Sequence, residues 1–165
     1  MMSQSLKTLG LTHEAVTFGL LCVPVGVAIG LFVSRDANDG SLGYFAVFAA
    51  LSAFLVSTFL WWLLIQRTNK RTNRRAVTVG ILTGLLSHWL CWYLMLLWSN
   101  VDFWLLGGTG SSLGEAPMNP LFGIAGVLAL CLWSWALFAW VTVGAGIGIA
   151  LVWLWAGRAT FGSGR

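Results

Sequence analysis

The side chains best able to do chemistry in the apolar part of the chain gather around His88. This histidine lies in the stretch SHWLCWY, within residues 76–101, which contain no lysine, arginine, aspartate or glutamate. An ionisable side chain at membrane depth is expected to face other helices or a wet cavity rather than lipid. At 3.6 residues per turn, one side of a helix here forms a candidate functional face consisting of Gly80, Gly84, Ser87, His88 and Cys91.

Two roles for His88 remain open at this stage. It is either a neutral side chain hydrogen-bonded to a neighbouring helix, or a functional gate, relay or ligand. Thirteen residues separate it from Arg75 and ten from Trp98, which places it near the middle of a bilayer. No second histidine or carboxylate lies at that depth, which argues against a haem held by two histidines in one chain. Only several copies around an axis would bring His88 rings together as a pore or proton relay.

Other constellations that carry chemistry are missing from the sequence. There is no HExxH, no nucleophile elbow and no Ser/His/Asp set at one depth. Cys22, Cys91 and Cys131 lie in separate apolar runs without a CxxC pair, as expected of buried free thiols. We therefore expect no catalytic residue, no cofactor and no metal, in a protein that is not an enzyme.

The composition determines what elements can position these residues. Of the 165 residues, 58% are hydrophobic and only 8% are charged, whereas soluble domains carry about 25% charged residues. Because a membrane-spanning helix needs about 20 apolar residues, the sequence predicts an all-α integral membrane protein. We expect a single domain, a bundle of four transmembrane helices at residues 15–34, 42–66, 76–98 and 133–155.

The fourth apolar run is longer than one span requires. Residues 121–156 would form about 54 Å of helix against a hydrocarbon core of roughly 30 Å. Tryptophan favours the membrane interface, so the pair Trp133 and Trp135 and the pair Trp153 and Trp155 mark the two ends of the expected span. Residues 120–132 would then be an apolar outer-side segment before it, as a helical extension, an interfacial piece or a re-entrant turn. Alternatively, the span covers residues 121–140 and breaks at the glycines of 144–148, which we otherwise interpret as a close helix contact.

Lysine and arginine set the expected orientation. The loop RTNKRTNRR, residues 67–75, holds five of the nine basic residues, and short loops of this kind stay in the cytoplasm. Both termini would then be cytoplasmic, with loop 99–120 outside, and we expect a bacterial-type inner membrane. The outer side would receive the acidic residues Asp36, Asp39, Asp102 and Glu115.

The same basic loop is a candidate for docking a cytoplasmic protein or anionic membrane lipid. Its candidate docking residues are Arg67, Lys70, Arg71, Arg74 and Arg75. Topology alone also explains these charges. Nucleic acid is not expected as a partner, because no aromatic side chain interleaves with the basic ones.

Small side chains suggest how the helices associate, because close backbone approach drives helix packing in lipid. Small-residue faces recur on three spans, more than one central seam requires. They comprise Gly19, Gly26 and Gly30, then Ala46, Ala49, Ala50, Ala53 and Ser57, and the face of His88. The first functional hypothesis is therefore a non-enzymatic subunit that forms a homo-oligomer or anchors a larger membrane complex.

Two further hypotheses stay open, since no motif names a substrate. One is an ion- or small-solute-conducting transport subunit in which His88 faces the pathway. The weaker one is a membrane sensor or immunity protein, with loop 99–120 as the sensing surface and residues 67–75 docking a partner inside.

Overall fold

The computed structural model describes residues 13–35, 44–108 and 116–162. All regular structure in these ranges is helical: α2 (His13–Ser34), α3 (Phe45–Trp61), the π-helical turn η1 (Trp62–Gln66), α4 (Asn73–Leu105) and α5 (Gly123–Gly162). Four stretches are long and apolar enough to cross a membrane, namely His13–Ser34, Phe45–Gln66, Asn73–Leu105 and Gly123–Gly157. The structure is thus consistent with an integral membrane protein.

The third helix is longer than predicted at both ends. It begins at Asn73, where the Thr72 side chain caps it by accepting a hydrogen bond from the backbone N–H of Arg75. It continues to Leu105, so the first seven residues of the expected loop 99–120 are helical. Residues 85–106 contain no glycine or proline, so the helix is uninterrupted until Gly107, whose φ of +72° is incompatible with continuing it.

The fourth helix begins ten residues before the predicted start at 133. Its start follows Asn119 and Pro120, a pair typical of a helix N-terminus. The Asn119 side chain accepts from the backbone N–H of Leu121, and its carbonyl accepts from that of Gly123. The helix passes through residues 144–148 without a break. Of the possibilities left open for residues 120–132, the helical extension is therefore the one found.

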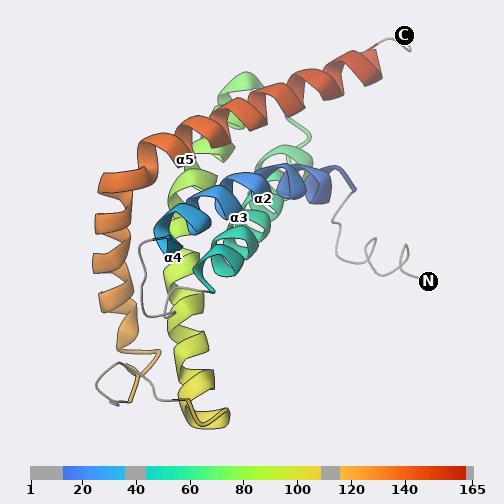
Figure 1. The fold of residues 1–165 in the computed structure, drawn as a ribbon. Helices are drawn as coiled ribbons and strands as arrows, with labels where there is room; N and C mark the ends of the chain where they lie inside the picture. The colour runs from blue at the N-terminus through green and yellow to red at the C-terminus, as the bar shows by residue number, and fades with distance from the viewer. Residues whose placement is uncertain (1–12, 36–43, 109–115, 163–165) are drawn as a thin grey trace, which may run out of the picture.

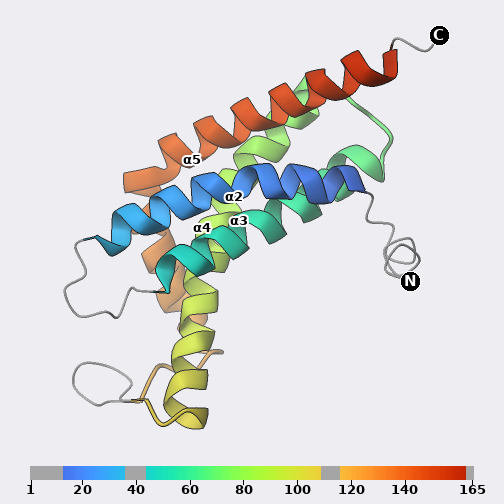
Figure 2. The ribbon, with the colours of Figure 1, turned by 45° about the vertical axis from the view of Figure 1, so that its right-hand side comes forward.

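A bend accommodates the length of α5. Its 40 residues correspond to about 60 Å, roughly twice a hydrocarbon core. Figure 1 shows α5 turning sharply near the 140 mark of its colour bar, with α4 on the inner side of the bend. Figure 2 shows the same turn from another side, together with a change of direction in α4. The fourth helix thus consists of two helical arms joined at a bend.

Close backbone contacts hold the helices in two antiparallel pairs. In the α2/α3 pair, a Cβ added to Gly26 would lie 2.6 Å from the Ala49 carbonyl oxygen, and one added to Gly30 would lie 2.3 Å from Ala46 Cα. In the α4/α5 pair, a Cβ on Gly80 would lie 2.5 Å from Ile147 Cα. Only glycine permits these approaches, so the small-residue faces of α2 and α4 are occupied inside the chain.

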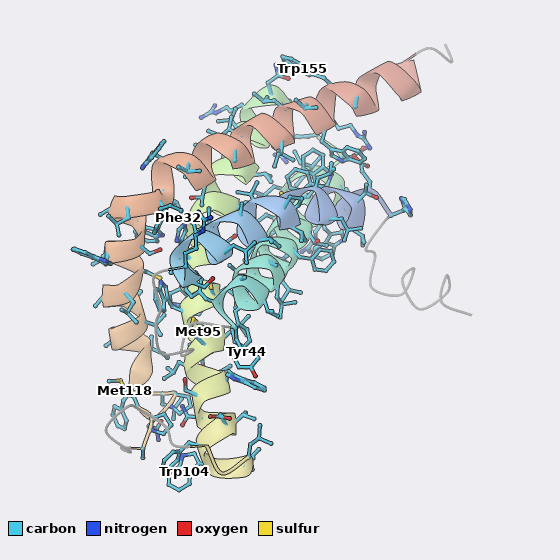
Figure 3. The ribbon with its side chains drawn as sticks, in the orientation of Figure 1. Phe32, Tyr44, Met95, Trp104, Met118 and Trp155 are labelled. Atoms are coloured by element: carbon cyan, nitrogen blue, oxygen red, sulfur yellow. The ribbon has the colours of Figure 1, made fainter. Side chains whose placement is uncertain are left out.

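The two pairs pack against one another over half of their length. The second half of α5 and the first half of α4 lie beside α2 and α3, while the other halves extend away together (Figures 1 and 2). Aromatic contacts between α3 and α4 mark where this packing ends: the ring centroids of Tyr44 and Trp98 are 5.4 Å apart. Beyond that level α4 and α5 form a two-helix arm, with Trp104 and Met118 at its far end (Figure 3).

Candidate functional site

His88 lies between α4 and α5 and bonds both ring nitrogens to α5. Its Nδ1 is 2.6 Å from Ser134 Oγ, and its Nε2 is 3.1 Å from Thr142 Oγ1. The residue is only 8% exposed. A buried imidazole with two partners is satisfied in its neutral form, without a counter-ion.

The neighbouring hydroxyl groups determine which ring nitrogen carries the hydrogen. Thr142 Oγ1 also lies 3.2 Å from the carbonyl oxygens of Gly84 and Phe138, to either of which it can donate. We therefore assign Ser134 Oγ as donor to Nδ1, and Nε2–H as donor to Thr142, which passes its own hydrogen to a carbonyl. In this assignment each hydrogen of the network formed by Ser134, His88 and Thr142 has an acceptor. The reverse assignment would leave the hydroxyl hydrogen of Ser134 without one among the contacts of the described residues.

The bend in α5 is what allows His88 to reach both hydroxyls. Ser134 and Thr142 are eight residues apart, about 12 Å along the axis of a straight helix. One imidazole ring cannot bridge that distance with contacts of 2.6 and 3.1 Å. The bonds of Thr142 to the carbonyl oxygens of Phe138 and Ala139 in its own helix are of a kind that often bends helices. The network and the bend are therefore two aspects of one arrangement.

A cavity of about 330 Å³ adjoins this network. All four helices contribute to its wall, and none of the described residues in the wall is charged. Most of the wall is apolar, and its polar side chains are Thr83, Ser87, His88, Ser134 and Thr142, with the thiols Cys22 and Cys91. Small residues on α2 and α3, such as Gly26 and Ala49, leave the space that the larger side chains do not fill.

One of these hydroxyls lacks a partner. Thr83 is 5% exposed, and its Oγ1 has no hydrogen-bond partner among the described residues. Ser87, one turn later, instead donates to the carbonyl of Thr83 at 2.6 Å. A buried hydroxyl without a partner is uncommon, and each instance calls for an explanation.

The structure brings most of the predicted functional face together. Gly84, Ser87, His88 and Cys91 line the cavity, whereas Gly80 lies outside its wall, packed against α5. The sequence did not identify the partners on α5. A usable indication was present, because Ser134 and Thr142 are the only hydroxyl side chains in residues 121–156.

The predicted docking residues of loop 67–75 divide into two groups. Arg71 forms an ion pair with Glu14 at 2.7 Å, which ties the loop to the start of α2. Arg75 bonds to the Leu64 carbonyl oxygen and to the Thr68 hydroxyl. The side chains that face solvent are Arg67, Lys70 and Arg74.

Comparisons with known proteins do not assign the chain to a family. No family model matches it, and no curated protein or solved structure matches it either. Among the described residues, no group of three or more histidine, cysteine, aspartate or glutamate side chains could hold a metal ion. Cys22, Cys91 and Cys131 are free and buried.

Proposed function

We propose that this protein is a non-enzymatic membrane subunit that assembles with copies of itself through the outer face of α5. The proposal rests on an open face of small residues. Gly144 and Gly148 are exposed, and a Cβ added at either would meet nothing within 4 Å. They differ in this from Gly80 and Gly84 of α4, which are packed against α5.

The spacing on this face is that of a close helix contact in lipid. Gly144 and Gly148 are four residues apart, the small-xxx-small pattern that lets two helix backbones approach. Trp140 and Val152, four residues before and after them, are 77% and 65% exposed. The face is therefore a shallow apolar groove between two large side chains.

A second copy of the chain suits this groove. Residues 121–157 carry no lysine, arginine, aspartate or glutamate, so the groove offers a partner neither charge nor charge pairing. Its occupant must be an equally uncharged helix with a small-residue face. The same face of α5 meets this requirement, and two-fold contacts of this kind are the commonest in homo-oligomers.

The experiment is a comparison of association in mild detergent and in nanodiscs. Native mass spectrometry of the wild type should show dimers. The dimer dissociation constant of the Gly144→Leu variant should be at least about tenfold higher, because the leucine side chain separates the two backbones. The matched control is Ala28→Leu, which adds the same kind of bulk at an exposed small position on α2. A strictly monomeric wild type, or equal effects of the two variants, would refute the proposal.

For orientation, we propose that loop 67–75 and both termini are cytoplasmic in a bacterial-type inner membrane. The concentration of basic residues in that loop supports this orientation. It would leave Arg67, Lys70 and Arg74 free to contact a cytoplasmic protein or anionic lipid. The arm that ends near Trp104 and Met118 would lie toward the outer side.

Cysteine accessibility tests the orientation directly. Asn69→Cys should react in intact cells only with a permeant maleimide, and Ser111→Cys should react with an impermeant one as well. Ser111 lies outside the described residues, within the expected outer loop. The opposite labelling pattern would invert the map.

A second candidate function is conduction of an ion or small solute, favoured by the position of His88 in the wall of the cavity. Flux through reconstituted protein should then change in the His88→Ala variant. Absence of flux in the wild type would remove this candidate and leave the assembly proposal intact.

A further inference from the structure

We propose that the cavity beside His88 is a binding site for an uncharged, mostly apolar molecule of about two fused rings that carries one hydroxyl or carbonyl oxygen. This inference goes beyond assembly, because the cavity lies on the inner side of α5 and the proposed contact on its outer side. The size of the cavity, the absence of charge from its wall and the unpartnered Thr83 each support one part of it.

The size of the occupant follows from the cavity volume. A dry cavity of about 150 Å³ lined by aliphatic and aromatic side chains accommodates benzene. The present cavity of about 330 Å³ is roughly twice as large. Aromatic walls from Phe45, Trp92 and Phe138 would contact the faces or edges of a planar ring system.

The wall excludes a charged occupant. None of the lining residues is lysine, arginine, aspartate or glutamate. Of the described residues in the wall, His88 is the only titratable one besides the thiols, and both of its nitrogens are already bonded to Ser134 and Thr142. An ion in this position would lose its hydration without gaining a counter-charge, which is strongly unfavourable.

The polar atom of the occupant follows from Thr83. This residue lines the cavity, and no side chain or backbone group in the described part of the chain bonds to its hydroxyl. A hydroxyl can both donate and accept, so a ligand hydroxyl or carbonyl oxygen would satisfy it. The other wall hydroxyls already have partners: Ser87 bonds to the Thr83 carbonyl, and Ser134 and Thr142 bond to His88.

A pair of nearly isosteric probes tests these requirements on the full-length protein in detergent. Ligand-observed NMR should detect 1-naphthol bound more tightly than 1-methylnaphthalene, in which a methyl group replaces the hydroxyl. Thr83→Val keeps the shape of the side chain and removes its hydroxyl, so it should weaken 1-naphthol binding about three- to tenfold. Binding of 1-methylnaphthalene should be unchanged, and 1-naphthalenesulfonate should not bind.

Thr58→Val is the matched control. Thr58 is also buried with an unpartnered hydroxyl, but it is not among the residues that line the cavity. This variant should bind 1-naphthol like the wild type. Equal weakening in Thr58→Val and Thr83→Val, or binding of both naphthalenes that no variant changes, would refute the site and indicate partition into detergent.

The natural occupant could come from the membrane or from solution, and mass spectrometry of the purified protein distinguishes the two. Ala53→Leu, which adds bulk to the cavity wall, should abolish 1-naphthol binding. A neutral lipid that matches the proposed occupant in size and carries one hydroxyl or carbonyl oxygen, retained by the wild type and lost from this variant, indicates a lipid source, whereas an empty wild type that binds 1-naphthol indicates a solute. A charged phospholipid lost in the same way would overturn the proposal. If Ala53→Leu does not fold, the comparison of Thr83→Val with Thr58→Val tests the site without it.

Binding of 1-naphthol to a protein that shows no flux would also separate this inference from conduction.

Discussion

Replacing His88 by leucine tests whether its hydrogen bonds stabilise the α4/α5 pair. The substitution keeps an apolar side chain of similar size and removes both ring nitrogens. Hydrogen bonds between membrane helices contribute about 0.6 kcal/mol on average and at most about 1.7. Two such bonds, at 2.6 and 3.1 Å, are lost here, and Ser134, which is 6% exposed, keeps no other side-chain partner. We expect the free energy of unfolding to fall by about 1–3 kcal/mol.

The two partners of His88 should contribute unequally. Thr142 retains carbonyl acceptors at 3.2 Å after the change, whereas Ser134 loses its acceptor. In double-mutant cycles, His88→Leu with Ser134→Ala should show a coupling of about 0.6–1.7 kcal/mol, and His88→Leu with Thr142→Val a smaller one.

Unfolding by SDS in mixed micelles, followed by tryptophan fluorescence, measures these free energies. Ser87→Ala serves as the control, because Ser87 bonds only within α4 and its loss should change stability by no more than about 0.5 kcal/mol. A coupling to Ser134 near zero, or a larger coupling to Thr142, would refute the assigned direction of the network.

Two further substitutions address the packing and the loop. Gly80→Ala would place a Cβ 2.5 Å from Ile147 Cα, so α4 and α5 must separate, and the free energy of unfolding in the same assay should fall by about 1–3 kcal/mol. Gly144→Ala adds its Cβ in open space and should not lower the free energy of unfolding, because alanine favours a helix over glycine by about 0.5–1 kcal/mol. Glu14→Gln removes the ion pair between Glu14 and Arg71, whose side chains are 23% and 37% exposed. The free energy of unfolding should fall by less than about 1 kcal/mol, and by less still at high salt. A larger decrease, or one that does not depend on salt, would contradict this expectation.

The sequence predicted the four apolar helices because their composition leaves no alternative in lipid. It misplaced the ends of the third and fourth helices because hydropathy does not detect helix starts and stops. Asn119 with Pro120 begins the fourth helix well before its expected start, and Gly107 ends the third beyond its expected end. Trp135, one of the tryptophans used to mark the fourth span, donates its indole N–H to the Leu85 carbonyl of α4.

The candidate site was predictable on one helix and not between helices. Helical periodicity brought Ser87, His88 and Cys91 to one side of α4, and the structure places all three in the cavity wall. Ser134 and Thr142 could be singled out only as the hydroxyl side chains of residues 121–156. Their shared contact with one ring could not be predicted, because it depends on a bend that no proline or sequence period indicates. The vacant volume likewise results from how small residues of four helices meet, which a single sequence does not specify.

The glycines of α5 between residues 144 and 148 lie in different surroundings on the two sides of the helix. Gly146 faces α4, where a Cβ would lie 2.6 Å from the Gly80 carbonyl oxygen, and it also lines the cavity. Gly144 and Gly148, two residues to either side of Gly146, point away from it on a 3.6-residue helix and are open. A larger side chain at Gly144 or Gly148 therefore does not reach the cavity. We expect Gly144→Leu to reduce dimerisation with 1-naphthol binding unchanged, because a packed helix separates the two faces; a parallel loss of both would show instead that the cavity is completed only in the assembled protein.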